Sequence, residues 1–270
     1  MEKILKDAIS AAQQAGNVIM KYYNTKLEVK HKSINNPVTK ADLAANDIIK
    51  NILTSKYPNF GWLSEETKDS KDRLYKNQVW IIDPIDGTKE FIEGIPNFAI
   101  SIGLVKNHEP ILGVLYNPAT KELFYGSKNK GSFYNGKKCQ ISNLHDIEKV
   151  KLVISRSEIK AGLWQKFSFK TKNKIEIGSV AYKLGLIAAN KYDFFATLKP
   201  KNEWDICAGH IIVHEAGGVL KNILDFKSPK YNQIETLQKP GLVGGNVYMS
   251  TTFSKIWNEK NKHGGKNEEC

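Results

Sequence analysis

The stretch Val79-Trp80-Ile81-Ile82-Asp83-Pro84-Ile85-Asp86-Gly87-Thr88 (VWIIDPIDGT) runs from an apolar strand directly into two aspartates around a proline. Pro84 fixes its own φ and keeps its predecessor out of the helical region, and Gly87 permits a sharp turn. The turn could therefore direct both carboxylates and the Ile85 carbonyl toward one point. If a helical turn begins at Thr88, the free amides of Gly87 and Thr88 face the same point and suit a phosphate. The stretch predicts an oxygen-rich site for a cation and a phosphate.

The composition is that of an ordinary globular protein with a basic surface. The chain has 270 residues, 41% of them apolar, and a formal net charge of +12, so it can form one large domain or two subdomains. Arg73 and Arg156 are its only arginines, and the lysines are scattered. Because nucleic-acid readers usually favour the bidentate arginine fork, we expect a solvated lysine-rich surface and no nucleic-acid partner.

Cysteine usage and hydropathy indicate the compartment. Cys139, Cys207 and Cys270 are widely spaced, with no CxxC pair and no histidine spaced for zinc. The first twenty residues are interrupted by charged side chains, and no later apolar run approaches the roughly 18 residues of a membrane span. We therefore expect a cytoplasmic protein with reduced thiols and no membrane span.

The N-terminal half predicts two helices followed by a meander of strands. Apolar residues from Ile4 to Ile19 follow helical spacing, and a second helix begins at Thr39 with a capping-box-like Thr39-x-x-Asp42. Residues 78–134 then hold short strand-like runs separated by turn residues, which is typical of an antiparallel meander. We assign residues 1–147 to an N-terminal α+β subdomain that carries the predicted metal-binding motifs.

The C-terminal half alternates strands and helices. KLVIS (151–155), KIEIG (174–178), DFFAT (193–197) and VLKN (219–222) read as strands, and the segments from Ser179 and Trp204 read as helices. This alternation of strands and helices predicts a second α/β subdomain over residues 148–270 that completes the metal and substrate site. The polar tail from Asn258 to Cys270 is expected to be frayed.

Three further carboxylates have both a structural and a functional interpretation. Asp42 could simply cap the helix that it begins, and Asp205 could cap the apolar helix that follows it. Glu65, next to Glu66 in GWLSEET, could lie in a solvated loop. If these side chains instead gather with Asp83 and Asp86, each like-charged pair at ~4 Å costs about 4 kcal/mol at an effective dielectric near 20. A divalent cation would remove that cost, and oxygen ligands without His or Cys point to Mg²⁺ or Mn²⁺.

Three ordered motifs carry a family resemblance over nearly the whole chain. Ser64-Glu65-Glu66, Asp83-Pro84-Ile85-Asp86-Gly87-Thr88 and Trp204-Asp205-Ile206-Cys207-Ala208-Gly209, followed by Glu215-Ala216-Gly217-Gly218, resemble the inositol monophosphatase superfamily of lithium-sensitive, magnesium-dependent phosphatases. The resemblance implies an α/β (α+β) fold, the layered αβαβα sugar-phosphatase fold with two subdomains. It also implies an active site between the subdomains.

The resemblance implies a role for each matching residue. Glu65, Asp83 and the carbonyl of Ile85 would hold a first Mg²⁺, and Asp83, Asp86 and Asp205 a second, with two or three ions per site and Mn²⁺ as a substitute. Asp42 and Thr88, with Glu65, would orient and activate the attacking water. That water would attack phosphorus in line while the second ion neutralises the leaving oxygen.

Lys89-Glu90-Phe91 after the turn resembles the branch that hydrolyses 3′(2′),5′-bisphosphate nucleotides. We therefore expect hydrolysis of 3′-phosphoadenosine 5′-phosphate to AMP and phosphate, a reaction of sulfur metabolism. The alternative is an inositol monophosphatase or a fructose-1,6-bisphosphatase with the same metal chemistry.

Candidate substrate contacts are more widely spread. We expect them at Gly87, Thr88, Ser179, Lys183 and Asp205, with further donors near Ser155-Arg156-Ser157 and Lys201. Lys183 could equally be a surface lysine on its helix. The oligomeric state, monomer or homodimer, stays open.

Overall fold

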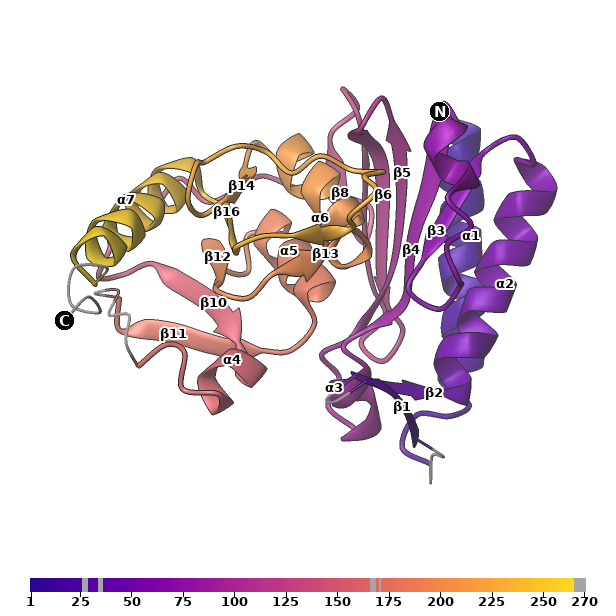
Figure 1. Cartoon of the computed structure of the whole chain (residues 1–270), viewed down its shortest axis with the longest axis horizontal. Helices are drawn as coiled ribbons and strands as arrows, with labels where there is room; N and C mark the ends of the chain where they lie inside the picture. Colours follow the sequence, from indigo (N-terminus) through magenta and orange to yellow (C-terminus); the bar gives the residue numbers. More distant parts are fainter. Residues whose placement is uncertain (26–28, 34–35, 166–168, 170, 265–270) are drawn as a thin grey trace.

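Helices and sheets alternate in five layers in the computed structural model of the chain, which describes residues 1–25, 29–33, 36–165, 169 and 171–264 (Figure 1). The order of the layers is αβαβα, with a seven-stranded sheet in the N-terminal half and a five-stranded sheet in the C-terminal half. The layered fold expected from the sequence is therefore confirmed.

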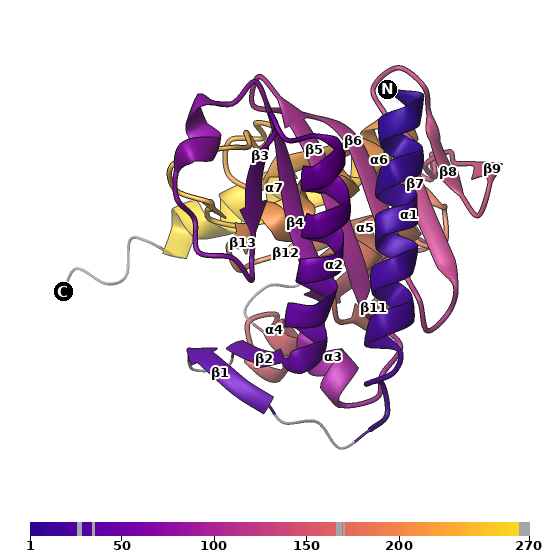
Figure 2. The same cartoon turned by 90° about the vertical axis from the view of Figure 1, so that its right-hand side faces the viewer.

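The two predicted N-terminal helices form the outer layer of the first half. They are α1 (Glu2–Ile19) and α2 (Lys40–Lys56), and they lie side by side over one face of the larger sheet (Figure 2). Thr39 is the N-cap of α2 and its hydroxyl accepts a hydrogen bond from the Ala41 amide over 3.1 Å. The helix starts that the sequence predicted are confirmed.

The larger sheet contains the predicted meander and two further strands, β3 and β9. Its order is β3-β4-β5-β6-β7-β8-β9, antiparallel from β4 onward. The strands are β3 (Gly61–Ser64), β4 (Gln78–Asp86), β5 (Ala99–Lys106), β6 (Glu109–Asn117), β7 (Glu122–Ser127), β8 (Ser132–Tyr134) and β9 (Lys137–Lys138). The sequence did not predict β3, which pairs in parallel with β4, whereas Glu65 and Glu66 lie in the turn that follows β3. Four residues carry too little pattern to show a strand, and the pairing depends on a partner distant in sequence.

The apolar run of β4 is explained by helices on both faces of the sheet. Trp80 and Ile82 pack with α1 and α2, whereas Val79 and Ile81 face the opposite core. Side chains alternate between the faces of a strand, so a strand covered on both sides has no polar position. Asp83 and Asp86 therefore stand at the end of a strand that is buried on both faces.

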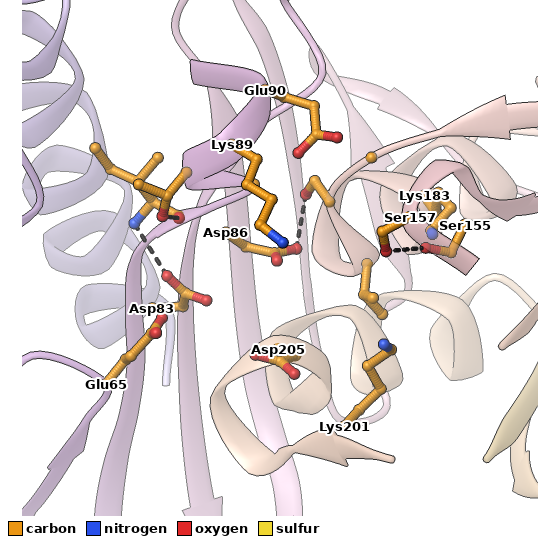
Figure 3. A pocket seen from close by; sticks show the side chains of 16 residues that line it. Glu65, Asp83, Asp86, Lys89, Glu90, Ser155, Ser157, Lys183, Lys201 and Asp205 are labelled. Atoms are coloured by element: carbon orange, nitrogen blue, oxygen red, sulfur yellow. Dashed lines mark hydrogen bonds between the residues drawn. The ribbon is translucent and has the colours of Figure 1, made fainter. Parts of the chain in front are cut away.

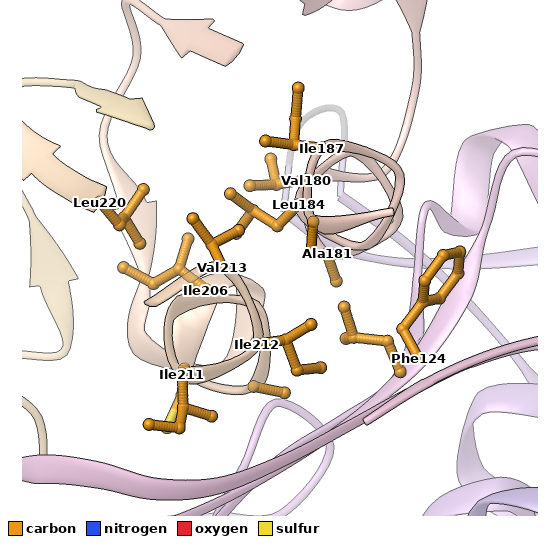
Figure 4. Packing of buried hydrophobic residues seen from close by; sticks show 14 of the residues in the cluster. Phe124, Val180, Ala181, Leu184, Ile187, Ile206, Ile211, Ile212, Val213 and Leu220 are labelled. Carbon is orange, nitrogen blue, oxygen red and sulfur yellow. The ribbon is translucent and has the colours of Figure 1, made fainter. Parts of the chain in front are cut away.

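The middle layer consists of α5 (Val180–Ala188) and α6 (Glu203–Glu215), whose apolar side chains interdigitate (Figure 4). Helix α6 approaches the larger sheet closely at Gly103 and Gly113, which lie opposite each other on β5 and β6. A Cβ at Gly113 would stand 2.3 Å from the Ala208 carbonyl oxygen, and one at Gly103 2.5 Å from Cys207 Sγ. The two glycines thereby set how near α6 lies to β5 and β6.

The smaller sheet has the order β11-β10-β12-β16-β14. Its strands are β10 (Lys151–Ser155), β11 (Asn173–Ile177), β12 (Phe194–Thr197), β14 (Val219–Asn222) and β16 (Leu242–Gly245). The sequence did not predict β16, because LVGG is short and half glycine. Helix α7 (Val247–Gly264) packs Met249 and Phe253 on the outer face of this sheet. Helix α7 continues to Gly264, so the fraying expected for the tail past its helix concerns residues 265–270, which lie outside the described part.

Short elements complete the fold. They are β1 (Val29–Ser33) paired with β2 (Asn36–Thr39), the 3₁₀ turn η1 (Asp72–Tyr75), α3 (Thr88–Ile92), α4 (Arg156–Lys160), and β13 (Lys201–Asn202) paired with β15 (Leu237–Gln238). The predicted boundary at residue 147 falls between β9 and β10, and one apolar cluster contains residues from both sides of it. Among the described helices, none has the length and hydropathy needed to span a bilayer.

Candidate active site

A cavity of about 200 Å³ opens where the end of β4 meets the starts of α5 and α6. Its walls include Glu65, Asp83, Asp86 and Asp205 on one side and Lys183 on the other (Figure 3). Acidic groups from both halves of the chain therefore meet basic groups in one hollow.

The turn after β4 places two carboxylates on the cavity wall. The pairing of β4 with β5 is interrupted between Asp83 and Asp86, where Pro84 cannot donate a ladder hydrogen bond. The Ile85 amide donates to Asp83 Oδ1 over 3.0 Å, which fixes that carboxylate. Gly87 has a φ of 98° and α3 begins at Thr88, as the sequence predicted.

Asp205 reaches the same point from the first turn of α6. Its Oδ2 accepts the Asn202 amide over 2.9 Å in a capping box, so Asp205 helps to cap α6 from its first turn, but the N-cap itself is Asn202 and not Asp205 as the structural interpretation had it. One carboxylate oxygen each from Asp83, Asp86 and Asp205 also lie within 4.8 Å of one another. Capping the helix and facing the cavity are thus compatible roles for one side chain.

Burial and mutual repulsion raise the pKa values of these acids. The pKa of Asp83 lies well above its ordinary value because of burial and the charges of Glu65, Asp86 and Asp205. Burial also raises the pKa of Asp86, against hydrogen bonds from Ser179 and the Ala181 amide. The pKa of Asp205 is raised by burial, then by Asp86 and Glu65. The cluster therefore carries unfavourable electrostatic energy that a cation would offset.

The donor set fits Mg²⁺ or Mn²⁺, because Asp83, Asp86 and Asp205 offer only oxygen atoms. Glu65 and Ile85 line the same cavity, although Glu65 is not part of the group of three. All five residues that the sequence assigned to metal binding therefore meet at one hollow.

Asp42 lies buried beside the cavity and not on its wall, with an exposed fraction of 1%. Its Oδ2 accepts the Thr39 amide and hydroxyl, both over 2.7 Å, and its Oδ1 accepts the Thr88 hydroxyl over 3.2 Å. Burial raises the pKa of Asp42. The side chain thus caps α2 and contacts the cavity residue Thr88 at once.

The side of the cavity opposite the carboxylates carries basic side chains, and one of the two interpretations of Lys183 is wrong. Lys183 is 1% exposed, so the interpretation as a surface lysine is wrong. Its Nζ donates to the Ile177 carbonyl over 3.3 Å, and burial, together with the charge of Lys201, lowers its pKa to about 8. Lys201 also lines the cavity, 3.9 Å from the buried carboxylate of Glu158.

Ser179 joins the two walls. Its hydroxyl donates to Asp86 Oδ2 over 2.7 Å and accepts the Tyr182 amide over 3.0 Å. Its φ of 40° is unusual for a residue other than glycine, and such strain is concentrated at functional sites. Ser155 and Ser157, also expected near the substrate, line the same cavity.

Lys89 and Glu90 also line the cavity, although the sequence identified them only as a mark of substrate class. Because both residues directly follow the turn at Gly87, the sequence could have identified them as residues that line the cavity. Arg156, expected near the substrate, does not line this cavity. Its guanidinium pairs with Glu93 and lies 3.5 Å from Glu90 Oε1.

Known proteins resemble the whole chain. The family model described as inositol monophosphatase family matches residues 1–258. Inositol monophosphatase 3 of Solanum lycopersicum is 33% identical over 96% of this chain and 98% of its own. The 3′(2′),5′-bisphosphate nucleotidase CysQ of Aggregatibacter actinomycetemcomitans is 31% identical over 94% and 96%. The solved structure of an IMPase from Thermotoga maritima superposes with a TM-score of 0.83 at 28% identity, covering 97% of this chain and 99% of that one.

Proposed function

The chain belongs to the inositol monophosphatase family, and from that premise we propose that it is a Mg²⁺-dependent phosphatase that converts 3′-phosphoadenosine 5′-phosphate to AMP and phosphate. The observation that carries the proposal is the division of the cavity. Glu65, Asp83, Asp86 and Asp205 line one side of the cavity and Lys183 and Lys201 the other, and Lys89 and Glu90 also lie on its wall. Such a site suits a substrate with one phosphate at a cation centre and a second phosphate some distance away.

Glu65, Asp83, Asp86, Asp205 and the Ile85 carbonyl would hold the Mg²⁺ ions. When bound, Mg²⁺ supplies Lewis-acid activation of water and charge neutralisation at phosphorus. The chain's own contribution is to orient a water with the Thr88 hydroxyl and to accept its proton through Asp42, to which Thr88 is hydrogen-bonded. The amides of Gly87 and Thr88, at the start of α3, would bind the scissile phosphate.

The second phosphate would bind at the basic wall. Lys183 and Lys201 can stabilise it because both are largely withdrawn from water, with side-chain exposure of 15% at Lys201. Binding energy from this remote group can be used at the reacting phosphate. Inositol 1-phosphate lacks such a second anion, so it would not gain from the lysines.

A second candidate activity is hydrolysis of inositol phosphate or fructose 1,6-bisphosphate. It is favoured by the printed names of the relatives, since inositol monophosphatases appear beside CysQ at similar identity. The metal chemistry is the same for both candidate activities. They differ only in how the cavity residues away from the carboxylates bind the rest of the substrate. For the cellular setting we propose the cytoplasm, where buried thiols such as Cys139 and Cys207 stay reduced.

The deciding experiment is phosphate release from four substrates: 3′-phosphoadenosine 5′-phosphate, 3′-AMP, inositol 1-phosphate and fructose 1,6-bisphosphate. We expect kcat/KM for the bisphosphate nucleotide to exceed that for inositol 1-phosphate at least ~10-fold, about 1.4 kcal/mol. Lys183→Met and Lys201→Met should each lower kcat/KM for the bisphosphate nucleotide toward the value for 3′-AMP, which lacks the second phosphate. If inositol 1-phosphate or fructose 1,6-bisphosphate is the better substrate, the nucleotidase assignment is wrong.

A further inference from the structure

Arg73, one of the two arginines of the chain, is buried with an exposed fraction of 2% and has no place in the proposed chemistry. It lies in η1, on the segment that follows Glu65. Its Nε and one terminal nitrogen donate to the two oxygens of Asp69 over 3.1 and 2.8 Å. The other terminal nitrogen donates to Asn232 Oδ1 over 2.7 Å. A buried guanidinium with this many partners fixes the segments that it joins.

Asn232 continues the connection to the start of α6. Its side-chain amide donates to the Arg73 carbonyl over 3.2 Å, and its main-chain amide donates to Glu203 Oε2 over 2.6 Å. The Gln233 amide donates to the other oxygen of Glu203 over 2.8 Å. Glu203 is fully buried, so both of its oxygens are satisfied inside the protein by this one loop.

The network joins two segments that carry predicted metal ligands. Asp69 and Arg73 follow Glu65 closely in the chain, and Glu203 stands two residues before Asp205. Glu65, Trp204 and Thr236 line one further small cavity, which confirms that the three segments lie together. The Glu203 amide also donates to the Thr236 carbonyl over 3.0 Å. The hydrogen bonds that Arg73 and Asn232 make between the two segments are at least partly buried, whereas the one from Lys71 Nζ to the Ile234 carbonyl, over 3.0 Å, is exposed.

We propose that Arg73 and Asn232 are positioning residues that hold the segment of Glu65 against the segment of Asp205, so that these two ligands, one for each of two neighbouring cations, stay in place beside Asp83. The inference rests on the proposed metal-dependent function. The carboxylates repel one another when no cation is bound, so a rigid connection is needed to keep them at ligand distance. Residues that orient metal ligands through hydrogen bonds typically change metal affinity about 10- to 100-fold when they are removed.

The test compares two buried asparagines. Asn232→Ala removes both side-chain hydrogen bonds between Asn232 and Arg73 and leaves the bond from Arg73 to the Gln233 carbonyl, and Asn246→Ala is the matched control. Asn246 is 2% exposed, against 6% for Asn232, and at the junction of β16 and α7 its side-chain amide donates to the Ser142 and Leu144 carbonyls over 2.7 and 3.0 Å. Binding of Mn²⁺ is measured by electron paramagnetic resonance of the free ion, with no substrate present. We expect Asn232→Ala to bind Mn²⁺ at least ~10-fold more weakly than the parent protein, and Asn246→Ala to bind it within twofold of the parent.

A kinetic measurement separates positioning from a general loss of structure. The Mg²⁺ concentration for half-maximal activity should rise in Asn232→Ala, and kcat should recover at saturating Mg²⁺. Arg73→Lys keeps the charge but loses the planar guanidinium fork that donates to both oxygens of Asp69 and to Asn232 at once, so it should show the same shift. It also serves as the second variant if Asn232→Ala does not fold.

Equal Mn²⁺ affinity in the parent, Asn232→Ala and Arg73→Lys would overturn the inference while leaving the proposed function standing. Equal weakening in Asn232→Ala and Asn246→Ala would also overturn it, because the effect would then be general destabilisation. If the parent protein itself binds no Mn²⁺, the metal centre of the proposed function fails instead.

Discussion

The hydroxyl of Thr88 lies 3.2 Å from Asp42 Oδ1 and 3.1 Å from the carbonyl oxygen of Ile85. It thereby connects the first turn of α2 with the turn that ends β4. The other oxygen of Asp42 accepts two hydrogen bonds from Thr39. The two interpretations of Asp42, helix cap and proton acceptor, use different oxygens and do not exclude each other.

The first prediction concerns Asp42→Asn. The amide keeps an oxygen that can cap α2, but it cannot accept a proton from Thr88 or a water. We expect kcat to fall by at least ~100-fold, the usual contribution of a general base, while the free energy of unfolding falls by no more than about 1 kcal/mol. Phosphate release and urea unfolding check the two quantities, and a kcat within a few-fold of the parent would remove Asp42 from the proposed mechanism.

The second prediction concerns Asp83→Asn. Asp83 is 2% exposed and lies among Glu65, Asp86 and Asp205. The substitution removes a metal ligand and also removes repulsion, so activity should vanish while the melting temperature without metal stays equal or rises. Turnover close to that of the parent would contradict the assignment of Asp83 to both ions. A strongly lowered melting temperature would show that its charge stabilises the fold.

The third prediction concerns metal removal. Activity should disappear in EDTA and return with Mg²⁺ but not with Zn²⁺ alone, because the donor set is all oxygen. Mg²⁺ at about 100 times its dissociation constant should stabilise the parent by about 2.7 kcal/mol, measured as a rise in melting temperature. Asp83→Asn is the control and should show little of this rise. Full activity after exhaustive chelation would refute a metal-dependent mechanism.

The fourth prediction concerns the contact between Glu90 and Gly178. A Cβ at Gly178 would stand 2.1 Å from Glu90 Cδ and 2.4 Å from its Cγ, and Glu90 is itself buried. Gly178→Ala should therefore cost about 1–3 kcal/mol of stability by overpacking. In a Glu90→Ala background the cost should be smaller. A double-mutant cycle by urea unfolding measures the difference, and strictly additive losses would show that the contact does not restrict residue 178.

The fifth prediction concerns the pH dependence set by Lys183. Burial and the charge of Lys201 lower its pKa to about 8, against the charges of Glu158, Asp86 and Glu90, which raise it. Lys183 is therefore charged below about pH 8 and loses its charge above it. We expect KM for 3′-phosphoadenosine 5′-phosphate to rise above about pH 8 more steeply than KM for 3′-AMP. The excess should disappear in Lys183→Met; if it persists there, another group causes it.

Much of the fold was readable from short-range pattern. Helical spacing identified α1 and α2, and β-type runs identified β4 to β8, because side-chain periodicity is a local property of the chain. The turn at Pro84 and Gly87 was also predictable, since those two residues restrict or release backbone angles on their own. The strands β3 and β16 were missed because each is four residues long and depends on its neighbours in the sheet.

Some features of the candidate site were also predictable from local sequence, and others depend on the tertiary structure. The types and order of its carboxylates were determined by the sequence, which also placed Asp83 and Asp86 on one turn. Only the tertiary structure decided that Asp205 meets them, because its position depends on how closely α6 packs over Gly103 and Gly113. Tertiary packing also buried Arg73 and Lys183, and for Lys183 the sequence had left open both a substrate contact and a surface position. The physical reason is that periodicity reports which face of an element is apolar, whereas the distance between residues far apart in sequence is set by the packing of those faces.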